Sequence, residues 1–588
     1  MLTNLLWLTP VWPLLVLLLL LLWPSRSTFS GLWLSAPLPG LLLAILATGD
    51  PAASFIELPW LFLGAIWWLD ETRQIFLLVS SLLWFAAGFY ARGYLGQAKG
   101  QDAASLRRFE YLWLLTLAGN LLLIVAEDVA SFYAGFVALT FAGYGLVIHF
   151  RTPEALLAGR QYLYLALLGE GFILAGLLGT AAQAAGPTLT QLSLVFQAEN
   201  ASALPLMACL LLGFGVKAGL PLLHVWLPVA HPVAPTPASA VLSGALVKAG
   251  LLAWILLLPL GRSSWPELAE PLLIAGLVSA LGAGLIGALQ LKAKAVLAYS
   301  TVSQLGMITS LIAVGLMADA LWALLLPVIL VFVVHHGLNK GALFLAVGVA
   351  EKPAGVWRWP LFVLFLLPPL ALVGWLTSGT WTKTLMKTLL YQEGWEQLAF
   401  WLTLAAISTS LLMARYLWLL LVAQQQSAAV EATQQPTKGA SAWMLGGWLL
   451  LLITGLSLPW WLPLEGVSLI WPAMQGWIDL AWPVLLALAV AGVAAVATRS
   501  SSAWQAWAPP LGDLLVVYMA LGCGFLRAFK AFAAQLQRLW HSLQQLPAQG
   551  QRLQPLLERL SEWEVSWRRE AALAFTLLLV VLAGLLLI

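Results

Sequence analysis

Apolar runs of about 20 residues recur along almost the whole chain, and they constrain the fold more than any other feature. A helix of that length spans the hydrocarbon core of a bilayer. Of the 588 residues, 61% are hydrophobic and only 9% are charged, whereas soluble domains carry about 25% charged residues. A β-barrel would instead show short segments of alternating polarity. The sequence therefore predicts an all-α polytopic membrane protein and excludes an ordinary globular domain.

Run length alone predicts about 16 transmembrane helices. The approximate spans are 4–23, 31–48, 75–95, 110–126, 130–149, 161–183, 203–223, 237–259, 270–290, 295–315, 322–348, 360–385, 398–423, 441–463, 476–497 and 571–588. The first span has no basic region before it and no small-residue cleavage site after it. We therefore expect a retained helix there and not a signal peptide.

The charges in the connections predict an orientation. One set of connections holds the basic residues Arg92, Lys99, Arg107, Arg108, Arg151, Arg160, Lys292, Lys294, Lys352 and Arg358. The alternate set, at 127–128, 184–202, 316–320 and 388–397, holds acids and no Lys or Arg. By the positive-inside rule the first set is cytoplasmic. Both termini are then expected on the outer side of a bacterial-type inner (cell) membrane.

The segment 511–566 has a different pattern. Its apolar residues recur at steps of three and four, with basic and amide side chains between them, as at Phe525, Arg527, Phe529 and Lys530. That pattern is typical of an amphipathic helix that lies along a membrane surface. It is either a surface helix without a special role or a lateral brace across neighbouring helices or subunits. A final transmembrane helix at 571–588 follows.

The ionisable residues inside the apolar spans include the basic Lys217, Lys248, Lys340 and Lys383, and Glu170 is the clearest acid among them. Charge at membrane depth costs at least about 2.5–3.5 kcal/mol and usually has a function. His336 precedes Lys340 by one helical turn, so both lie on one helix face. Any one of these side chains could snorkel or make a structural hydrogen bond. The set indicates a proton or ion relay.

Helix-breaking residues accompany two of the lysines. Gly219 and Pro221 follow Lys217, and Pro368, Pro369, Gly374 and Gly379 precede Lys383. Broken helices at membrane depth are tolerated where they line a cavity. The five-span segments 110–259 and 270–423 each carry such a break in their fourth span, as expected for inverted repeats. They are flanked by helices in 1–109 and 441–497.

Other chemistries find little support. The sequence shows no nucleophile–base pair, phosphate-binding loop, redox cofactor motif or metal-ligand cluster, so we expect no catalytic residue, cofactor or metal. His224 and His231 lie in a Pro-rich segment, where relay or packing roles are favoured over metal binding. Cys209 and Cys523 are expected to be packing residues. The net charge of +3 gives no indication of nucleic-acid binding.

Three stretches carry a family resemblance: GFGVKAGLPLLHVWLPVAHPVAPTPASAVLSGALVKAG, LKAKAVLAYSTVSQLGMI and HHGLNKGALFLAVG. They resemble the antiporter-like subunits of respiratory complex I and of Mrp-type cation/proton antiporters, over about residues 75–423. The resemblance implies that Lys217 and Lys383 are the ionisable residues of the two broken helices. It also implies that Lys248 connects the half-channels, and that His336 and Lys340 are the pair of the second half.

One position departs from the family. The usual glutamate partner of Lys217 would align with Val137 or a close neighbour, and the span holds no acid. We hypothesise that Glu170, on the next helix, pairs with Lys217 instead. His224 joins the predicted relay.

The resemblance implies a proton-translocating subunit with no redox site of its own, within a multi-subunit membrane complex. The stretch SGTWTKTLMK is similar to the D-type member of the Mrp antiporters, whereas the lateral helix resembles that of complex I. Expected partners are other membrane subunits, the lipid bilayer, and protons with Na⁺ or another monovalent cation. As an enzyme it would be at most a translocase subunit of an NADH-quinone oxidoreductase-like complex. Alternatives are a subunit of an inorganic-carbon uptake or membrane-bound hydrogenase complex, a standalone solute transporter, and a structural subunit with a degenerate channel.

Overall fold

The fold was analysed in a computed structural model that describes residues 1–497, apart from 24–30, 48–54, 63, 98–101, 198–202, 376, 434–438, 463, 465–471 and 473, together with 509–512, 534, 535 and 538. The chain divides into two compact units, Met1–Asp513 and Leu514–Ile588. The predicted lateral helix at 511–566, the final span at 571–588 and Cys523 lie outside the described residues, apart from a few isolated positions.

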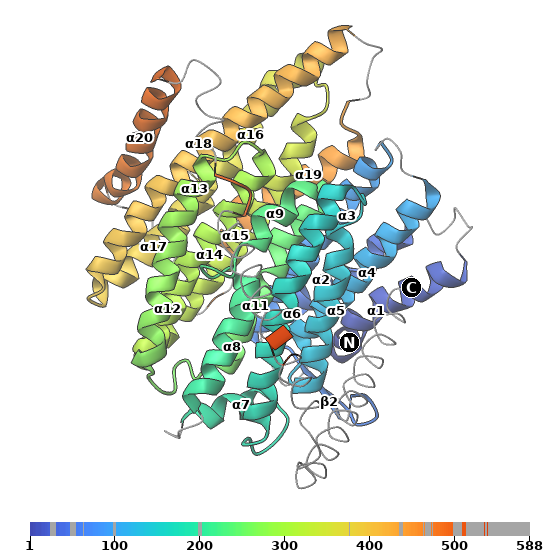
Figure 1. The fold of residues 1–588 in the computed structure, drawn as a ribbon, viewed down its shortest axis with the longest axis vertical. Helices are drawn as coiled ribbons and strands as arrows, with labels where there is room; N and C mark the ends of the chain where they lie inside the picture. The colour runs from blue at the N-terminus through green and yellow to red at the C-terminus, as the bar shows by residue number, and fades with distance from the viewer. Residues whose placement is uncertain are drawn as a thin grey trace. The chain divides into compact units, whose positions relative to one another are not determined.

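The first unit is almost entirely helical (Figure 1). Its α-helices are α1 (Leu2–Leu22), α2 (Leu38–Leu46), α3 (Glu71–Leu95), α4 (Ala103–Val125), α5 (Val129–Val147), α6 (Pro153–Ala181), α7 (Leu189–Leu194), α8 (Ala203–Ala218), α9 (Trp226–Val233), α10 (Thr236–Val241), α11 (Lys248–Leu257), α12 (Pro266–Val278), α13 (Gly284–Ala288), α14 (Ala293–Met317), α15 (Trp322–Ala350), α16 (Arg358–Val373), α17 (Ser378–Gln392), α18 (Glu396–Thr433), α19 (Ala442–Ser457) and α20 (Met474–Ala497).

Among the described residues, 13 helical segments are long and apolar enough to cross a membrane, and Leu32–Leu46 and Ala203–Ala218 are shorter apolar helices. Each predicted span from 4–23 to 476–497 coincides with one of these segments, which confirms a multi-pass helical membrane fold. The predicted number of about 16 is not reproduced, because two segments are short and 571–588 lies outside the described part. The segment 360–385 consists of two helices, α16 and α17.

Polar residues between the apolar runs fix where several helices begin. Asp70, Asp102, Asp128, Thr152 and Ser441 are the N-caps of α3, α4, α5, α6 and α19, and each side chain accepts a hydrogen bond from a backbone N–H of the first turn. Such caps satisfy backbone donors that a helix leaves unpaired. The short polar connections therefore define the helix boundaries.

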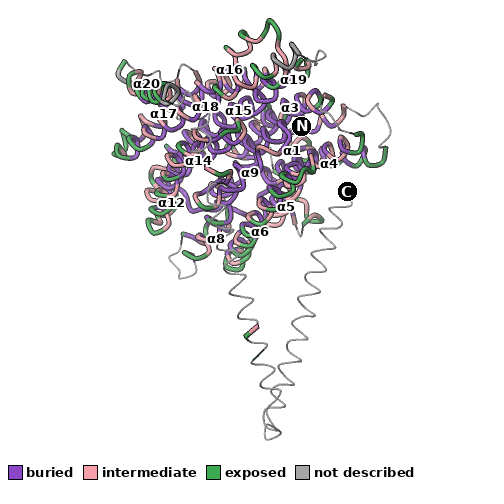
Figure 2. Tube along the Cα trace, turned by 45° about the horizontal axis from the view of Figure 1, so that its top comes forward, coloured by how far each residue is buried: buried purple, intermediate pink, exposed green. Residues whose placement is uncertain are grey.

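The most buried helices lie at the centre of the first unit. Within their most apolar windows, 94% of α14 is buried but only 17% of α20. Figure 2 shows buried residues concentrated around α14 and α15, with exposed residues on outer helices such as α12, α6 and α20. Of the lysines in the predicted relay, Lys340 lies on α15, whereas Lys217, Lys248 and Lys383 lie on α8, α11 and α17.

Close helix packing in the first half depends on small residues. A Cβ atom added at Gly119 of α4 would lie 2.6 Å from the Leu139 backbone nitrogen of α5, and one at Gly135 would lie 2.6 Å from the Leu123 backbone nitrogen. Such separations exclude any larger residue, as is common where membrane helices meet.

One small sheet interrupts the helical pattern. β1 (Phe55–Leu58) and β2 (Ala65–Trp68) form an antiparallel hairpin in which Phe55 pairs with Trp68. The sequence analysis expected no strand here. The aromatic and β-branched residues of these strands suit a pleated surface, and Trp67 extends the contact by bridging to Ala126 after α4.

Candidate ion-relay site

Lys217 lies in the last turn of α8, directly before a break in the helix. α8 ends at Ala218, and Gly219 and Leu222 have φ angles of +75° and +69°. Glycine adopts such angles without steric cost, and Pro221 has no N–H to continue the helical ladder. The chain becomes helical again at α9. The lysine itself is only 3% exposed, so its ammonium group lies within the protein beside the break.

A chain of hydrogen bonds joins Lys217 to Glu170. Lys217 Nζ donates to Tyr162 Oη at 2.9 Å, and Tyr162 Oη donates to the Thr140 carbonyl at 3.0 Å. Thr140 Oγ1 in turn lies 2.9 Å from Glu170 Oε1 and donates to it. The structure thus brings Glu170 and Lys217 into one cluster, within electrostatic range of each other.

The contact between Glu170 and Lys217 is not a direct ion pair. The ion pairs within 4.0 Å among the described residues both belong to Arg73, with Asp70 and Glu127. Tyr162 and Thr140 occupy the positions that bridge the acid to the base. We call Glu170, Thr140, Tyr162 and Lys217 the first cluster.

Aromatic rings surround the ammonium group of Lys217. Its Nζ lies 4.9 Å from the centroid of the Tyr162 ring and 5.8 Å from those of Phe136 and Trp226. Ring faces attract cations, most strongly where water is excluded. Trp226 also donates its indole N–H to the Val216 carbonyl at 2.8 Å, which ties α9 back to α8 across the break.

The position aligned with the family glutamate is less buried than the first cluster. Val137 is only half-buried, whereas Thr140, three residues later on α5, is fully buried and contacts Glu170. α5 therefore contributes a hydroxyl to the cluster and α6 contributes the acid. The alignment identified the missing acid at Val137, but neither Thr140 nor Tyr162 was predicted, because hydroxyl groups within apolar runs do not stand out.

Lys248 is the first residue of α11, directly after a π-helical segment, Leu242–Leu246. π-helical turns inside helices are often found at functional sites. Lys248 Nζ donates to the Ser243 carbonyl in that segment at 2.8 Å. Ser243 Oγ lies 2.7 Å from Thr301 Oγ1 of α14, so the segment is joined to the central helices.

His336 and Lys340 occupy one face of α15, and both have no exposed surface. Lys340 Nζ donates to the Leu297 carbonyl of α14 at 2.8 Å. His336 lies within electrostatic range of Lys248 and Lys340, and more weakly of Lys383. These four basic groups form the second cluster. Like charges held close together in a buried site oppose one another's protonation.

Lys383 lies on α17, after the second break. Gly374 ends α16 with a φ angle of +92°, and a Cβ there would lie 2.6 Å from Lys383 Cγ. Lys383 is 2% exposed. Its Nζ lies 3.2 Å from Met307 Sδ and 5.6 Å from the centroid of the Phe332 ring. The break therefore provides the space in which this side chain packs.

Two polar side chains of α15 contact neighbouring helices: His335 reaches the start of α17, and Asn339 reaches α19. His335 Nδ1 lies 3.1 Å from Ser378 Oγ, and Asn339 Nδ2 donates to the carbonyls of His335 and Gly455 at 2.8 and 3.0 Å. Neither His335 nor Ser378 was among the predicted residues, although the sequence HHGLNK contains the histidine.

The two remaining histidines of the Pro-rich segment pack against rings. His224 lies edge-on to Tyr299 with 6.3 Å between ring centroids, and His231 stacks on Phe344 at 4.6 Å. His231 also lies within electrostatic range of Lys340, whereas neither ring contact joins His224 to the first cluster. In the described part of the chain, no three His, Cys, Asp or Glu side chains are grouped so that they could hold a metal ion.

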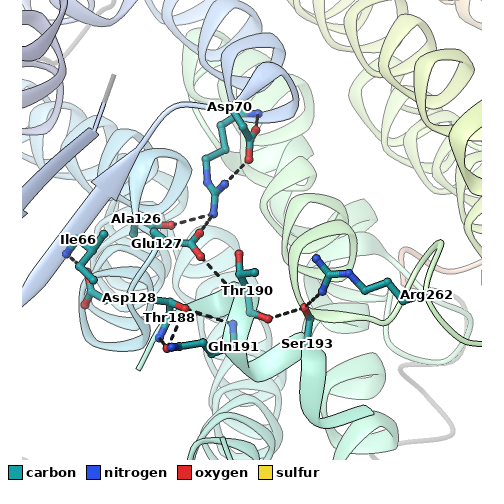
Figure 3. A network of polar contacts seen from close by, with 11 residues as sticks. Ile66, Asp70, Ala126, Glu127, Asp128, Thr188, Thr190, Gln191, Ser193 and Arg262 are labelled. Atoms are coloured by element: carbon teal, nitrogen blue, oxygen red, sulfur yellow. Dashed lines mark hydrogen bonds and ion pairs between the residues drawn. The ribbon is translucent and has the colours of Figure 1, made fainter. Parts of the chain in front are cut away.

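A buried ion-pair network, which the sequence analysis missed, joins several helix ends (Figure 3). Arg73 at the start of α3 is 1% exposed and pairs with Asp70 and Glu127. Glu127 Oε1 accepts from the Thr190 N–H of α7 at 3.0 Å. Ser193 Oγ, which donates to the Thr190 carbonyl at 2.8 Å, accepts from Arg262. In the sequence, this network is indicated by DETR at the start of a helix. Those residues look like the charged residues of an ordinary loop.

Comparisons with known proteins agree with this architecture. Residues 126–356 match the family described as NADH:quinone oxidoreductase/Mrp antiporter, TM. Hydrogenase-4 component B of Escherichia coli (strain K12) is 31% identical over 292 residues, which are 48% of this chain and 42% of that protein. The putative antiporter subunit mnhA2 of Staphylococcus saprophyticus is 29% identical over 318 residues, 51% of this chain and 39% of that protein. The chain thus matches about two fifths of the length of these relatives.

Solved structures share the fold over a larger part of the chain. A chain of the Mrp complex from Dietzia sp. DQ12-45-1b superposes with a TM-score of 0.65 at 19% identity, covering 82% of this chain and 99% of that one. A chain of the membrane-bound sulfane sulfur reductase, an archaeal respiratory membrane complex, superposes with a TM-score of 0.62 at 18% identity, covering 83% and 98%.

The matched segment contains the whole first cluster and three of the four members of the second, and Lys383 lies beyond its end at residue 356. The family match, the named relatives and the shared fold are consistent with one another. Over residues 126–356, the chain matches the NADH:quinone oxidoreductase/Mrp antiporter transmembrane family.

Proposed function

We propose that this chain is a proton-translocating, antiporter-like subunit of a multi-subunit membrane complex. The observation that carries the proposal is the second cluster: Lys248, His336, Lys340 and Lys383 lie together in the buried centre of the membrane-spanning unit. Ionisable groups are costly at membrane depth and typically mark ion or proton pathways.

The arrangement suits stepwise proton movement. Because like charges oppose each other's protonation, a proton that arrives at one member of the second cluster favours release from its neighbour. The first cluster adds a buried base that donates to the Tyr162 hydroxyl and a buried acid that accepts from the Thr140 hydroxyl. The Tyr162 hydroxyl in turn donates to the Thr140 backbone carbonyl. Both breaks leave backbone without regular helical bonding, as is found beside cavities in membrane proteins.

We further propose the partners and the location. Relatives that bear the names of a hydrogenase component and an antiporter subunit support a role beside other membrane subunits in the cell membrane. The exchanged ion would be Na⁺ or another monovalent cation, and both chain termini would lie outside. The energy would come from that cation gradient or from partner subunits.

A second candidate function is supported by Val137. Because α5 contributes no acid at this position, the first half-channel could be degenerate, and the chain would then be a structural subunit. The two candidates differ in whether Lys217 and Lys383 matter for transport.

The test uses the full chain purified with its copurifying subunits and reconstituted into liposomes that contain a pH-sensitive dye. Proton flux is driven by a K⁺ diffusion potential in one arm and by a Na⁺ gradient in the other. We expect Lys383→Ala to lower the flux about 100-fold, the lower end of the contribution of a positioned proton-transfer group. Lys217→Ala and Glu170→Gln test the first cluster in the same assay.

The matched control is Lys352→Ala in the connection between α15 and α16, a lysine that belongs to neither cluster, with flux expected unchanged. Native gel mobility checks that each variant still assembles. If Lys217→Ala and Lys383→Ala assemble and retain full flux, the proton-translocation proposal is wrong and the structural role stands. If Lys383→Ala lowers the proton flux and Lys217→Ala does not, proton conduction belongs to the second half of the chain alone.

A further inference from the structure

A second lysine on α17 follows Lys383 by one helical turn. Lys387 and Lys383 are four residues apart and therefore lie on the same face of the helix. Lys387 Nζ donates to the backbone carbonyl of Asp479 on α20 at 3.3 Å. The Asp479 carboxylate is also within electrostatic range of this lysine, as Lys387 is of Lys383. The three residues thus form a row of base, base and acid.

Burial decreases along this row. Lys383 is 2% exposed, whereas Lys387 and Asp479 are both half-buried. In the predicted orientation, α17 runs from the break at Gly374 toward the outer connection at 393–395, and α20 begins at the same side. Lys387 and Asp479 then lie between the buried lysine and the outer face.

α20 is held beside the second break by an aromatic contact. The rings of Trp375, in the break, and Trp477, at the start of α20, meet edge-on with centroids 6.1 Å apart. Asp479 follows Trp477 by two residues, so the contact between the two tryptophans fixes where Asp479 lies along the length of α17. α20 is otherwise one of the least buried helices, with 17% of its apolar window covered. A half-buried acid on so exposed a helix is costly at membrane depth unless a cation lies beside it.

We infer that Lys387 and Asp479 form the outer outlet of the second half-channel, with α20 supplying the acid that accepts the proton from the lysine row. The inference rests on the proposed function and extends it to two residues beyond the matched segment 126–356. Lys387 passes a proton between Lys383 and Asp479. The carboxylate offsets the repulsion between the two lysines and releases the proton to the outer side.

The first experiment measures outward proton flux in the reconstituted complex. Asp479→Asn and Lys387→Gln are each expected to lower flux about tenfold, less than loss of a buried relay group, because water can replace part of an outlet. Asp479→Glu should restore most of the flux, because it keeps the carboxylate. Glu393→Gln removes an exposed acid from the nearby connection after α17 and is the matched control, with flux expected unchanged.

A second measurement locates the outlet without depending on transport. Asp479→Cys is introduced into a chain whose Cys209 and Cys523 are replaced by serine, and a membrane-impermeant thiol reagent is added to one side at a time. We expect labelling from the outer side alone. Labelling only from the cytoplasmic side, or none from either side in folded protein, would overturn the inference.

The outcomes separate the inference from the proposed function. If Asp479→Asn and Lys387→Gln keep full flux while Lys383→Ala abolishes it, the outlet lies elsewhere and the relay stands. If Lys383→Ala also keeps full flux, the proposed function itself falls. A loss in Asp479→Asn that Asp479→Glu does not restore would also contradict the outlet, because it would indicate a packing role for the aspartate.

Discussion

At the scale of single residues, a tyrosine hydroxyl joins the buried base of the first cluster to the residue that contacts its acid. Tyr162 accepts from Lys217 and donates to the Thr140 carbonyl. This hydroxyl is a polar contact for Lys217 Nζ, whose surroundings also include the aromatic rings of Phe136 and Trp226. Because Tyr162 and Thr140 lie between the base and the acid, Lys217 and Glu170 do not form a direct ion pair.

Removing this hydroxyl gives the first prediction. In Tyr162→Phe the ring remains but both hydrogen bonds are lost, so we expect proton flux to fall about tenfold and unfolding free energy to fall by about 1–2 kcal/mol. Flux in liposomes and thermal unfolding in detergent measure the two effects. Tyr164→Phe is the control, because Tyr164 lies on the same helix but is 68% exposed. Equal flux in both variants would contradict a role for the hydroxyl.

His149, in the connection after α5, gives a prediction about pH. Burial, and then the charges of Arg108 and Arg151, lower its pKa from 6.5 to about 4. The folded state therefore binds this proton less well than the unfolded state, and stability is lost as pH falls from about 6.5 to about 4, by up to about 3 kcal/mol. Over that range, His149→Phe should lose less thermal stability than the natural protein. If the thermal stability of the two proteins changed in parallel with pH, His149 would not be the group responsible for the loss.

The buried charged residues of the proposed relay stood out in the sequence, and their polar partners did not. A lysine such as Lys248 or Lys340 stands out in an apolar run because its burial is costly. Thr140 and Tyr162 cost little to bury and do not stand out. Arg73 lies at a helix start, where a charge is ordinary, and only the fold shows that Glu127, 54 residues later, reaches it.

At the scale of elements, the helix breaks were predictable and the local helix geometry was not. Glycine and proline marked the ends of α8 and α16, as the sequence analysis expected. The π-helical segments Leu242–Leu246 and Ser279–Ala283 were not predicted, because a one-residue change in helical pitch leaves hydropathy unaltered. The β1–β2 hairpin was missed because its strands of four residues are too short for a clear alternation.

The second break gives a prediction at this scale. Gly374→Ala places a Cβ 2.6 Å from Lys383 Cγ at a backbone φ of +92°. We expect Lys383 to be displaced, with proton flux reduced at least about tenfold and stability reduced by about 1–2 kcal/mol. Gly446→Ala in α19 is the control, since a Cβ there meets no atom within 4 Å, and it should be neutral or slightly stabilising. Unaltered flux in Gly374→Ala would show that the break tolerates a side chain.

At the scale of the whole membrane unit, the Arg73 network connects segments that are distant in sequence. It joins the start of α3 to the turn between α4 and α5, and through Thr190 and Ser193 to α7 and the connection after α11 (Figure 3). All these points lie on the predicted outer side. The helices of the first half are therefore fastened at one end, while the buried clusters lie deeper in the bilayer.

This arrangement predicts that the network stabilises the fold and does not carry protons. Arg73→Met leaves Asp70 and Glu127 without their shared cation, and loss of one partner from a buried pair costs about 3–5 kcal/mol. The double variant Arg73→Met/Glu127→Gln should recover part of that loss, because it removes an uncompensated charge. Arg160→Met, at an exposed position of α6, is the control. Thermal unfolding in detergent measures the order of stabilities, and flux per assembled complex should stay near that of the natural protein. A double variant less stable than Arg73→Met, or flux lost from fully assembled protein, would instead indicate that the network belongs to the transport path.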